Sequence, residues 1–293
     1  MMNFGQAELA LDAKADLGEG PLWDDRIGQL VWVDIMAGRV NLFDTLTGGT
    51  RSIDVGVPVG AAALRESGGL VLAVKDGFAA LDTETGKMSQ LSGFPGAAAD
   101  IRMNDAKCDP QGRMWAGTMA FDLHDGAGAL YRFDTDGGVT TMLTGVTCSN
   151  GTDWSPDGKL MYYVDSMTKR IDCFDFDAAA GAISGRRTFV EIELKDAAPD
   201  GLTVDSEGNI WVALWGGGCV RCYSPDARLI GSVDVPASQS SCCVFGGADL
   251  DELYITSART GLPEEELARQ SLAGGLFRFR PGVKGVRAKR FAG

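Results

Sequence analysis

The sequence predicts an all-β fold, a six-bladed β-propeller with four antiparallel strands in each blade, and two observations lead to this prediction. First, a polar residue is followed eight residues later by the glycine of a tight turn and then by an apolar run with a large aromatic residue, in units that start at Asn104, Asn150 and Asp200. Second, related units start at Glu19, Val59 and Phe245. The six copies are spaced by roughly forty to fifty residues, a repeat length typical of propeller blades.

Inside each copy, short segments of alternating apolar and polar residues between turn residues predict strands. The third strands of the copies are expected at 39–44, 77–82, 128–134, 170–175, 219–223 and 275–279. Fourth strands are expected at 88–91, 140–143 and 230–235. The N-terminal stretch 8–17 should pair with the last copy as its outer strand and so close the ring. Helical composition is confined to 263–270. No linker interrupts the repeats, so we expect one domain over residues 1–293.

The composition of the chain argues against some classes of binding partner and indicates the cellular compartment in which we expect the protein. The chain has 293 residues, with 45% hydrophobic and 23% charged residues, as in ordinary globular proteins. Its formal net charge of −13 argues against nucleic acid and against an anionic membrane as partners. No apolar stretch is long enough to span a bilayer, and no signal-peptide pattern opens the chain. Seven cysteines, an odd number, suit reduced thiols, so we expect a cytoplasmic protein of unspecified oligomeric state.

The first residues of the innermost strands should form a ring around one end of the central channel. The six positions are Glu19, Val59, Asn104, Asn150, Asp200 and Phe245. Four of them carry side-chain oxygens, which suit a hard divalent cation and leave coordination positions for water or substrate. The oxygens do not identify the ion, which could be Ca²⁺, Zn²⁺, Mn²⁺, Mg²⁺ or iron. The alternative interpretation is that Asn150-Gly151 and Asp200-Gly201 are simply turn dipeptides.

Other catalytic systems find little support in the sequence. His124 is the only histidine, so a nucleophile-histidine system would depend on one residue, which we expect to be exposed in the loop 121–126. No nucleophile-elbow, P-loop or dinucleotide-binding pattern occurs. The Cys219–Cys222 pair has metal-site spacing, but it falls on a predicted strand, where residues three apart face opposite sides.

At this level of detail the chain resembles the SMP-30/gluconolactonase family, which includes regucalcin and bacterial sugar lactonases. The motifs that carry the resemblance extend over nearly the whole chain: Gly18-Glu19-Gly20-Pro21, Val33-Asp34-Ile35, Arg102-Met103-Asn104-Asp105, Gly117-Thr118-Met119, Ser149-Asn150-Gly151, Pro199-Asp200-Gly201 and Ser241-Cys242-Cys243. The resemblance implies that Glu19, Asn150 and Asp200 bind one divalent metal ion. It further implies that Arg102 and Asn104 contact the substrate, a small-molecule sugar lactone. The residue Asp122 falls near a family carboxylate that contacts sugar hydroxyls.

The function that follows is metal-dependent hydrolysis of an aldonolactone, such as glucono-, galactono-, arabinono- or xylonolactone. The ion would polarise the lactone carbonyl, and Asp200 would act as general base toward the attacking water. A metal-bound hydroxide oriented by Asp200 is the alternative, because metal binding lowers the pKa of a carboxylate. Two other functions stay open: a promiscuous metal-dependent arylesterase or organophosphatase, and a calcium-binding regulatory protein without turnover.

Overall fold

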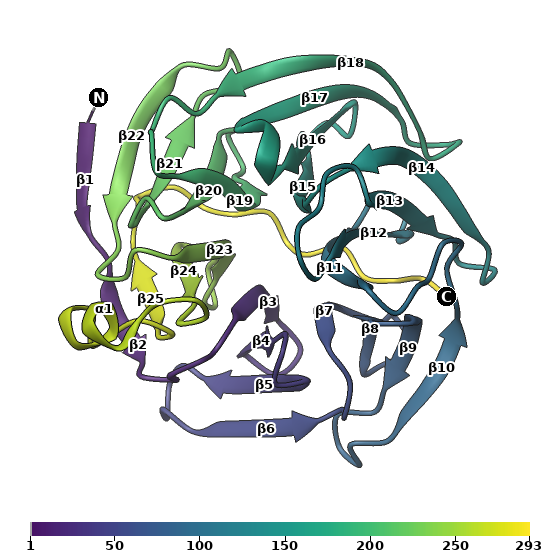
Figure 1. Cartoon of the computed structure of the whole chain (residues 1–293), viewed down its shortest axis with the longest axis horizontal. Helices are drawn as coiled ribbons and strands as arrows, with labels where there is room; N and C mark the ends of the chain where they lie inside the picture. The colour runs from purple at the N-terminus through teal and green to yellow at the C-terminus, as the bar shows by residue number, and fades with distance from the viewer. Residues whose placement is uncertain (1) are drawn as a thin grey trace.

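The structure, a computed structural model that describes residues 2–293, consists of six β-sheets arranged around a central axis (Figure 1). Each sheet is one blade, and the predicted six-bladed propeller is confirmed. The first three blades, from the inner strand outward, comprise β3 Gly18–Asp24, β4 Gln29–Asp34, β5 Arg39–Asp44 and β6 Thr50–Asp54; β7 Val59–Leu64, β8 Leu70–Val74, β9 Gly77–Leu81 and β10 Met88–Ser92; β11 Ile101–Cys108, β12 Met114–Ala120, β13 Gly128–Phe133 and β14 Val139–Val146.

The last three blades include both N-terminal strands. They comprise β15 Ser149–Trp154, β16 Leu160–Asp165, β17 Arg170–Asp177 and β18 Ala182–Glu191; β19 Ala198–Val204, β20 Ile210–Trp215, β21 Cys219–Tyr223, β22 Leu229–Asp234 and β1 Met2–Gln6; β23 Ser240–Gly246, β24 Glu252–Ser257, β25 Leu276–Phe279 and β2 Glu8–Leu11. Strand β2 pairs antiparallel with β25, so the N-terminal stretch closes the ring as predicted. Strand β1 was not expected: it pairs parallel with β22 and gives the fifth blade a fifth strand.

A separate hydrophobic cluster fills each of the six interfaces between neighbouring blades. The large aromatic residue predicted after each turn lies on the second strand of its blade and is buried in these clusters, as Trp32, Trp115, Tyr163, Trp211 and Tyr254 show. Each blade carries apolar side chains on both of its faces, so burying them requires a neighbouring blade on each side. The ring therefore stabilises every blade from two sides.

Helix is scarce in the described chain. A 3-10 turn, η1 Ser166–Thr168, follows β16, and α1 Glu264–Arg269 lies inside the predicted segment 263–270. Arg269 in the last turn of α1 forms ion pairs with Glu265 and Glu266. Within residues 2–293, neither the length nor the hydropathy of any helix is that of a membrane span.

The C-terminal segment crosses the end of the channel that lies opposite Glu19 (Figure 1). Gly285 forms a bridge with Asp205, just after β19, and Phe291 forms one with Arg65, just after β7. The ring of Phe291 stacks on Phe133 with 4.9 Å between centroids. The segment thus joins blades on opposite sides of the ring and covers this end of the channel.

Candidate functional site

Every blade has an irregularity at the same place, between its innermost strand and the next. The register shifts fall at Glu19/Leu22, Val59/Ala61, Met103/Ala106, Ser149/Thr152, Pro199/Leu202 and Ser240/Cys243. A bulge leaves residues without a partner on the adjacent strand and redirects their side chains. The predicted polar residues lie in or beside these six bulges, so strand geometry turns them toward the channel.

The dipeptides Asn150-Gly151 and Asp200-Gly201 lie inside β15 and β19, so the alternative interpretation as turns is wrong. Their glycines are required because the inner strands approach closely. A Cβ atom on Gly151 would lie 2.4 Å from the Asp200 carbonyl oxygen, and one on Gly201 would lie 2.2 Å from Cys242 Sγ. Glycine here serves the close packing of neighbouring blades, not a left-handed turn.

The sixth position of the ring was predicted incorrectly. Phe245 pairs with Leu253 near the far end of β23 and packs into an inter-blade cluster. The residue equivalent to Asn150 is Ser241, the second residue of its strand, beside the bulge that starts at Ser240. Its hydroxyl donates to the Gly18 carbonyl oxygen over 2.5 Å and lies 2.9 Å from Thr256 Oγ1. Ser241 therefore ties the last blade to the first.

Glu19 is a buried carboxylate with little hydrogen bonding. Its Oε2 accepts from the Gly20 amide over 2.9 Å, and its Oε1 accepts no hydrogen bond from the described residues. Burial and, after it, the Asp105 carboxylate raise the pKa of Glu19 to about 8, against the opposing effects of the Gly20 amide and Arg102. Such a group is costly to ionise in the metal-free protein.

Asn150 and Asp200 each have one side-chain oxygen, Oδ1 in both, that is buried and has no hydrogen-bond partner within the described chain. Asn150 is oriented by its amide, which donates to Ser166 Oγ over 3.0 Å. Burial raises the pKa of Asp200 well above its usual value, and Glu19 and Asp105 add to this, while Asn150 and the Gly201 amide oppose it. Buried oxygens without a hydrogen-bond partner are rare in proteins, which makes both of these oxygens candidates for binding a ligand.

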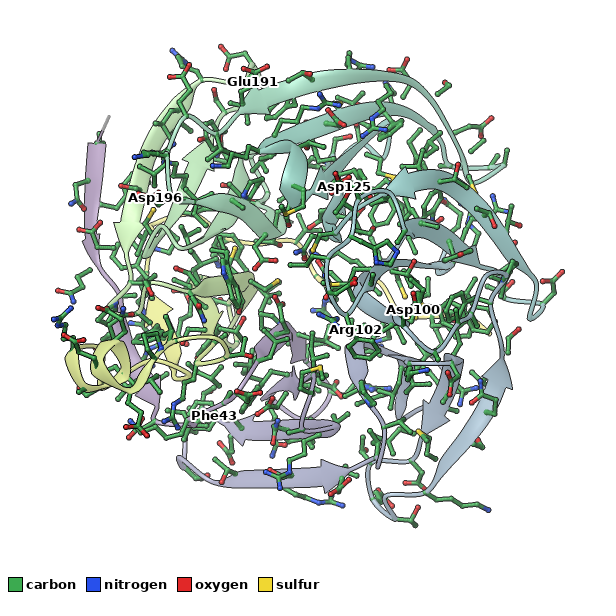
Figure 2. All side chains as sticks on the ribbon, in the orientation of Figure 1. Phe43, Asp100, Arg102, Asp125, Glu191 and Asp196 are labelled. Atoms are coloured by element: carbon green, nitrogen blue, oxygen red, sulfur yellow. The ribbon has the colours of Figure 1, made fainter. Side chains whose placement is uncertain are left out.

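Arg102 and Asn104 are joined in a buried pair beside this group. Arg102 Nη1 donates to Asn104 Oδ1 over 2.7 Å and to the Met103 carbonyl oxygen over 3.0 Å. Asn104 in turn donates to the Ser149 carbonyl oxygen on the next blade over 2.9 Å. Arg102 forms no salt bridge with Asp100 or Asp105, and Figure 2 places it near the centre of the ring. Burial lowers its pKa, and the charges of Cys148, Glu19 and Asp200 oppose this.

Asp122 is separate from this group. It lies on the exposed loop after β12, and its Oδ1 lies 2.6 Å from His124 Nδ1, whose exposed position is as expected. This hydrogen bond lowers the pKa of Asp122 and raises that of His124. The loop stands at the Arg102 end of the channel, because Arg102 pairs with Met119 and the Phe121 amide donates to Asp100. A role of Asp122 in substrate binding stays a prediction.

Two positioning residues were not identified from the sequence. The carboxylate of Asp34 accepts from the amides of Asp16 and Leu17, both over 3.0 Å, just before Glu19. Asp165 accepts from the amides of Thr147 and Cys148 over 3.1 and 3.0 Å, just before Asn150. Both are buried at the end of the second strand of their blades. The repeated Val-Asp at 33–34 and 164–165 was the available signal.

The side-chain oxygens of Glu19, Asn150 and Asp200 are of the kind that binds a hard divalent cation. Among residues 2–293 no three His, Cys, Asp or Glu side chains form a metal-binding group. The predicted set differs from such a group because one of its members is an amide, Asn150. Two carboxylates and one amide oxygen, with two of the oxygens unpartnered, are the donors that Ca²⁺ and similar ions use.

Comparison with known proteins agrees with the resemblance seen in the motifs. The family described as SMP-30/Gluconolactonase/LRE-like region matches residues 17–259. A Bacillus subtilis (strain 168) protein, provisionally named a sugar lactone lactonase, is 38% identical over 288 residues, which cover 98% of this chain and 99% of that protein. Regucalcin of Homo sapiens is 37% identical over 299 residues, which cover 100% of both chains.

The fold and the family are supported by a solved structure as well. The crystal structure of a calcium-binding protein, regucalcin, from Agrobacterium tumefaciens strain C58 matches with a TM-score of 0.95 and 29% identity, over 99% of each chain. The structural match and the sequence relatives both extend over nearly the whole propeller. The chain belongs to the SMP-30/gluconolactonase family.

Proposed function

We propose that the protein hydrolyses a sugar lactone to the aldonic acid, with one divalent metal ion held by Glu19, Asn150 and Asp200. The observation that carries this proposal is the pair of unpartnered buried oxygens, Asn150 Oδ1 and Asp200 Oδ1. A buried acceptor without a donor destabilises the fold unless a ligand supplies the missing interaction. Family membership and the sugar lactone lactonase among the relatives support the choice of reaction.

When bound, the ion would supply Lewis-acid chemistry, drawing electron density from the lactone carbonyl. The chain supplies the rest. Asp200 would accept the proton of the attacking water, since the described chain offers no histidine except the exposed His124. Water adds to the carbonyl carbon, the bond between that carbon and the ring oxygen breaks, and the proton taken up by Asp200 would pass to the departing ring oxygen, so each turnover releases one hydroxy acid.

Arg102 would orient the substrate. Its Nη1 is held by Asn104 Oδ1 and the Met103 carbonyl oxygen, so its remaining N–H groups are directed by fixed bonds. A guanidinium plane presents two parallel donors, which match neighbouring oxygens of a polyhydroxylated ring. Burial beside Glu19 and Asp200 keeps this cation close to where charge develops.

The test is a screen of purified protein against a panel of five- and six-membered sugar lactones, with acid release followed by a pH indicator. The protein is first treated with chelator, and Ca²⁺, Mn²⁺, Zn²⁺ and Mg²⁺ are then added back separately. We expect acid release that disappears on chelation and returns with at least one ion. Lactone hydrolysis at full rate in chelator would overturn the proposal.

A second candidate function is calcium binding without turnover, which the calcium-binding regucalcin of Agrobacterium tumefaciens favours. The same ring of oxygens would hold the ion in both cases. The two functions differ in one result of the screen. Calcium that binds and raises the melting temperature, with no acid released from any lactone or simple ester, would favour this second function.

A further inference from the structure

A cavity of about 250 Å³ lies inside the channel, between the six bulges and the C-terminal segment. Near the bulges it is lined by Gly20, Asp105 and Cys242, and at the other end by Val286 to Lys289. Lys107 and Asp153 line it in between. The cavity therefore lies between the candidate metal site and the C-terminal segment.

Lys107 extends across this cavity from the third blade. Its Nζ donates to Asp153 Oδ2 on the fourth blade over 2.9 Å and to the Leu202 carbonyl oxygen on the fifth over 2.9 Å. Asp153 cannot turn away from it, because the Val204 amide donates to the same Oδ2 over 3.0 Å and the Trp154 amide donates to Oδ1 over 2.8 Å. Carboxylate and carbonyl oxygens thus converge on the ammonium group.

A further carboxylate faces the same region. Asp105 lies in the bulge of β11, where its Oδ1 accepts from the Ala106 amide over 2.7 Å, and no other described donor reaches it. Burial raises the pKa of Asp105 to about 6, and Lys107 opposes this as the largest favourable charge. The same carboxylate raises the pKa values of Glu19 and Asp200.

We propose that the Lys107 ammonium takes the place of a second cation in the channel. A carboxylate oxygen and a carbonyl oxygen are donors that a hard cation takes, and here both accept from an ammonium group that is part of the chain and cannot leave the site. The inner position is therefore neutralised whatever the ion supply. The role of the ring as a metal site rests on the proposed function; the inner position stands on the Lys107 contacts alone.

If Lys107 replaces a cation, removing its side chain should change the number of divalent ions that the protein binds. Lys107→Ala should open the inner position to a free divalent ion, whereas Lys107→Met fills the space with an apolar chain and should not. The exposed pair Lys159–Asp157 provides a matched control, since Lys159→Ala removes a lysine from a surface ion pair. Chelated proteins are titrated with Mn²⁺ by calorimetry, and bound Mn²⁺ is counted by electron paramagnetic resonance. Melting temperatures are recorded with and without Mn²⁺.

We expect Lys107→Ala to bind one ion more than the wild type, and Lys107→Met and Lys159→Ala to match it. Adding Asp153→Asn to Lys107→Ala should remove the extra ion. Both Lys107 variants should melt lower than the wild type in chelator, and Mn²⁺ should restore only Lys107→Ala.

A folded Lys107→Ala protein with unchanged ion number overturns the inference. So does a Lys107→Ala protein that stays unfolded in excess Mn²⁺, because a free ion then cannot replace the ammonium. A wild type that binds no ion would instead refute the proposed metal site, and one ion in Lys107→Ala would still support the inner position.

Discussion

Two sets of buried carboxylates in this protein differ in how they are satisfied. Asp109 and Asp205 lie in the turns after β11 and β19, whereas Glu19 and Asp200 lie in the ring at the other end of the channel. All four are buried. They share the same chemistry and burial, and only their partners differ.

The turn carboxylates are fully engaged. Asp205 accepts from the amides of Glu207 and Asn209, from the Asn209 side chain and from Trp211 Nε1, over 2.8 to 2.9 Å. Asp109 accepts in the same way from two amides, from Arg113 Nε and from Trp115 Nε1. These bonds fix the turn and the buried tryptophan of the following strand, so the turn carboxylates serve the fold.

The ring carboxylates have few donors and stand close to one another. Glu19 accepts one hydrogen bond, and Asp200 Oδ1 accepts none. Glu19 helps to raise the pKa of Asp200, so ionising both carboxylates in the metal-free protein is costly. The comparison indicates that unmet hydrogen bonding, and not burial, distinguishes a ligand site from a structural carboxylate.

The largest expected effect is that of Asp200→Asn. The substitution replaces a charged ligand with a neutral amide and removes the predicted base, so lactone hydrolysis should fall by about a thousandfold or more. The metal-free variant should melt no lower than the wild type, because an unfavourable buried charge is gone. Activity and melting in chelator are measured on the same preparation. A large loss of metal-free stability would mean that Asp200 is structural after all.

Asp205→Ala should show the opposite pattern. Four donors lose their acceptor, among them Trp211 Nε1, and we expect a loss of about 2–4 kcal/mol in the free energy of unfolding. Ion stoichiometry and the Michaelis constant of the folded fraction should stay as in the wild type. Urea unfolding and calorimetric ion titration check both. Unchanged stability would contradict the structural role of the turn carboxylates.

Arg102→Lys should weaken hydrolysis of sugar lactones by about tenfold to a hundredfold, since lysine keeps the charge but loses the paired donors. Simple aryl esters, which lack ring hydroxyls, should be affected less. The ratio of kcat/KM for a sugar lactone to that for an aryl ester measures the effect. An equal loss for both substrates would show that Arg102 acts by offsetting the charges of Glu19 and Asp200 and not by contacting the substrate.

A smaller effect concerns pH and the stability of the metal-free protein. The pKa of Glu19 is raised to about 8 in the folded state. The contribution of Glu19 to the free energy of unfolding is therefore fully present below about pH 4.5 and is lost as the pH rises through 8. The melting temperature in chelator should therefore fall over this range, and Glu19→Gln should reduce the fall. Saturating metal should oppose it, because the ion binds the ionised groups. A melting temperature that rises with pH in chelator would contradict this.

The repeated unit in the sequence determined the blades, the strand at 8–11 that closes the ring, and five of the six ring positions. These features depend on local alternation and on turn residues, which each blade carries in its own sequence. The position of Phe245 was misassigned because Phe245-Gly246 is the dipeptide that matches most of the other copies, whereas Ser241 is followed by Cys242 and not by glycine, so only the strand register selects Ser241.

Other features were decided by contacts between distant segments. The parallel pairing of β1 with β22, the crossing of the channel by the C-terminal segment, and the bonds of Lys107 to Asp153 and Leu202 all join residues far apart in the chain. No local pattern encodes them, because each depends on closure of the ring. The sequence by itself indicated four residues with side-chain oxygens in the ring, Glu19, Asn104, Asn150 and Asp200. The tertiary structure alone decided which of those oxygens are already satisfied, since hydrogen bonds form only after the blades have packed.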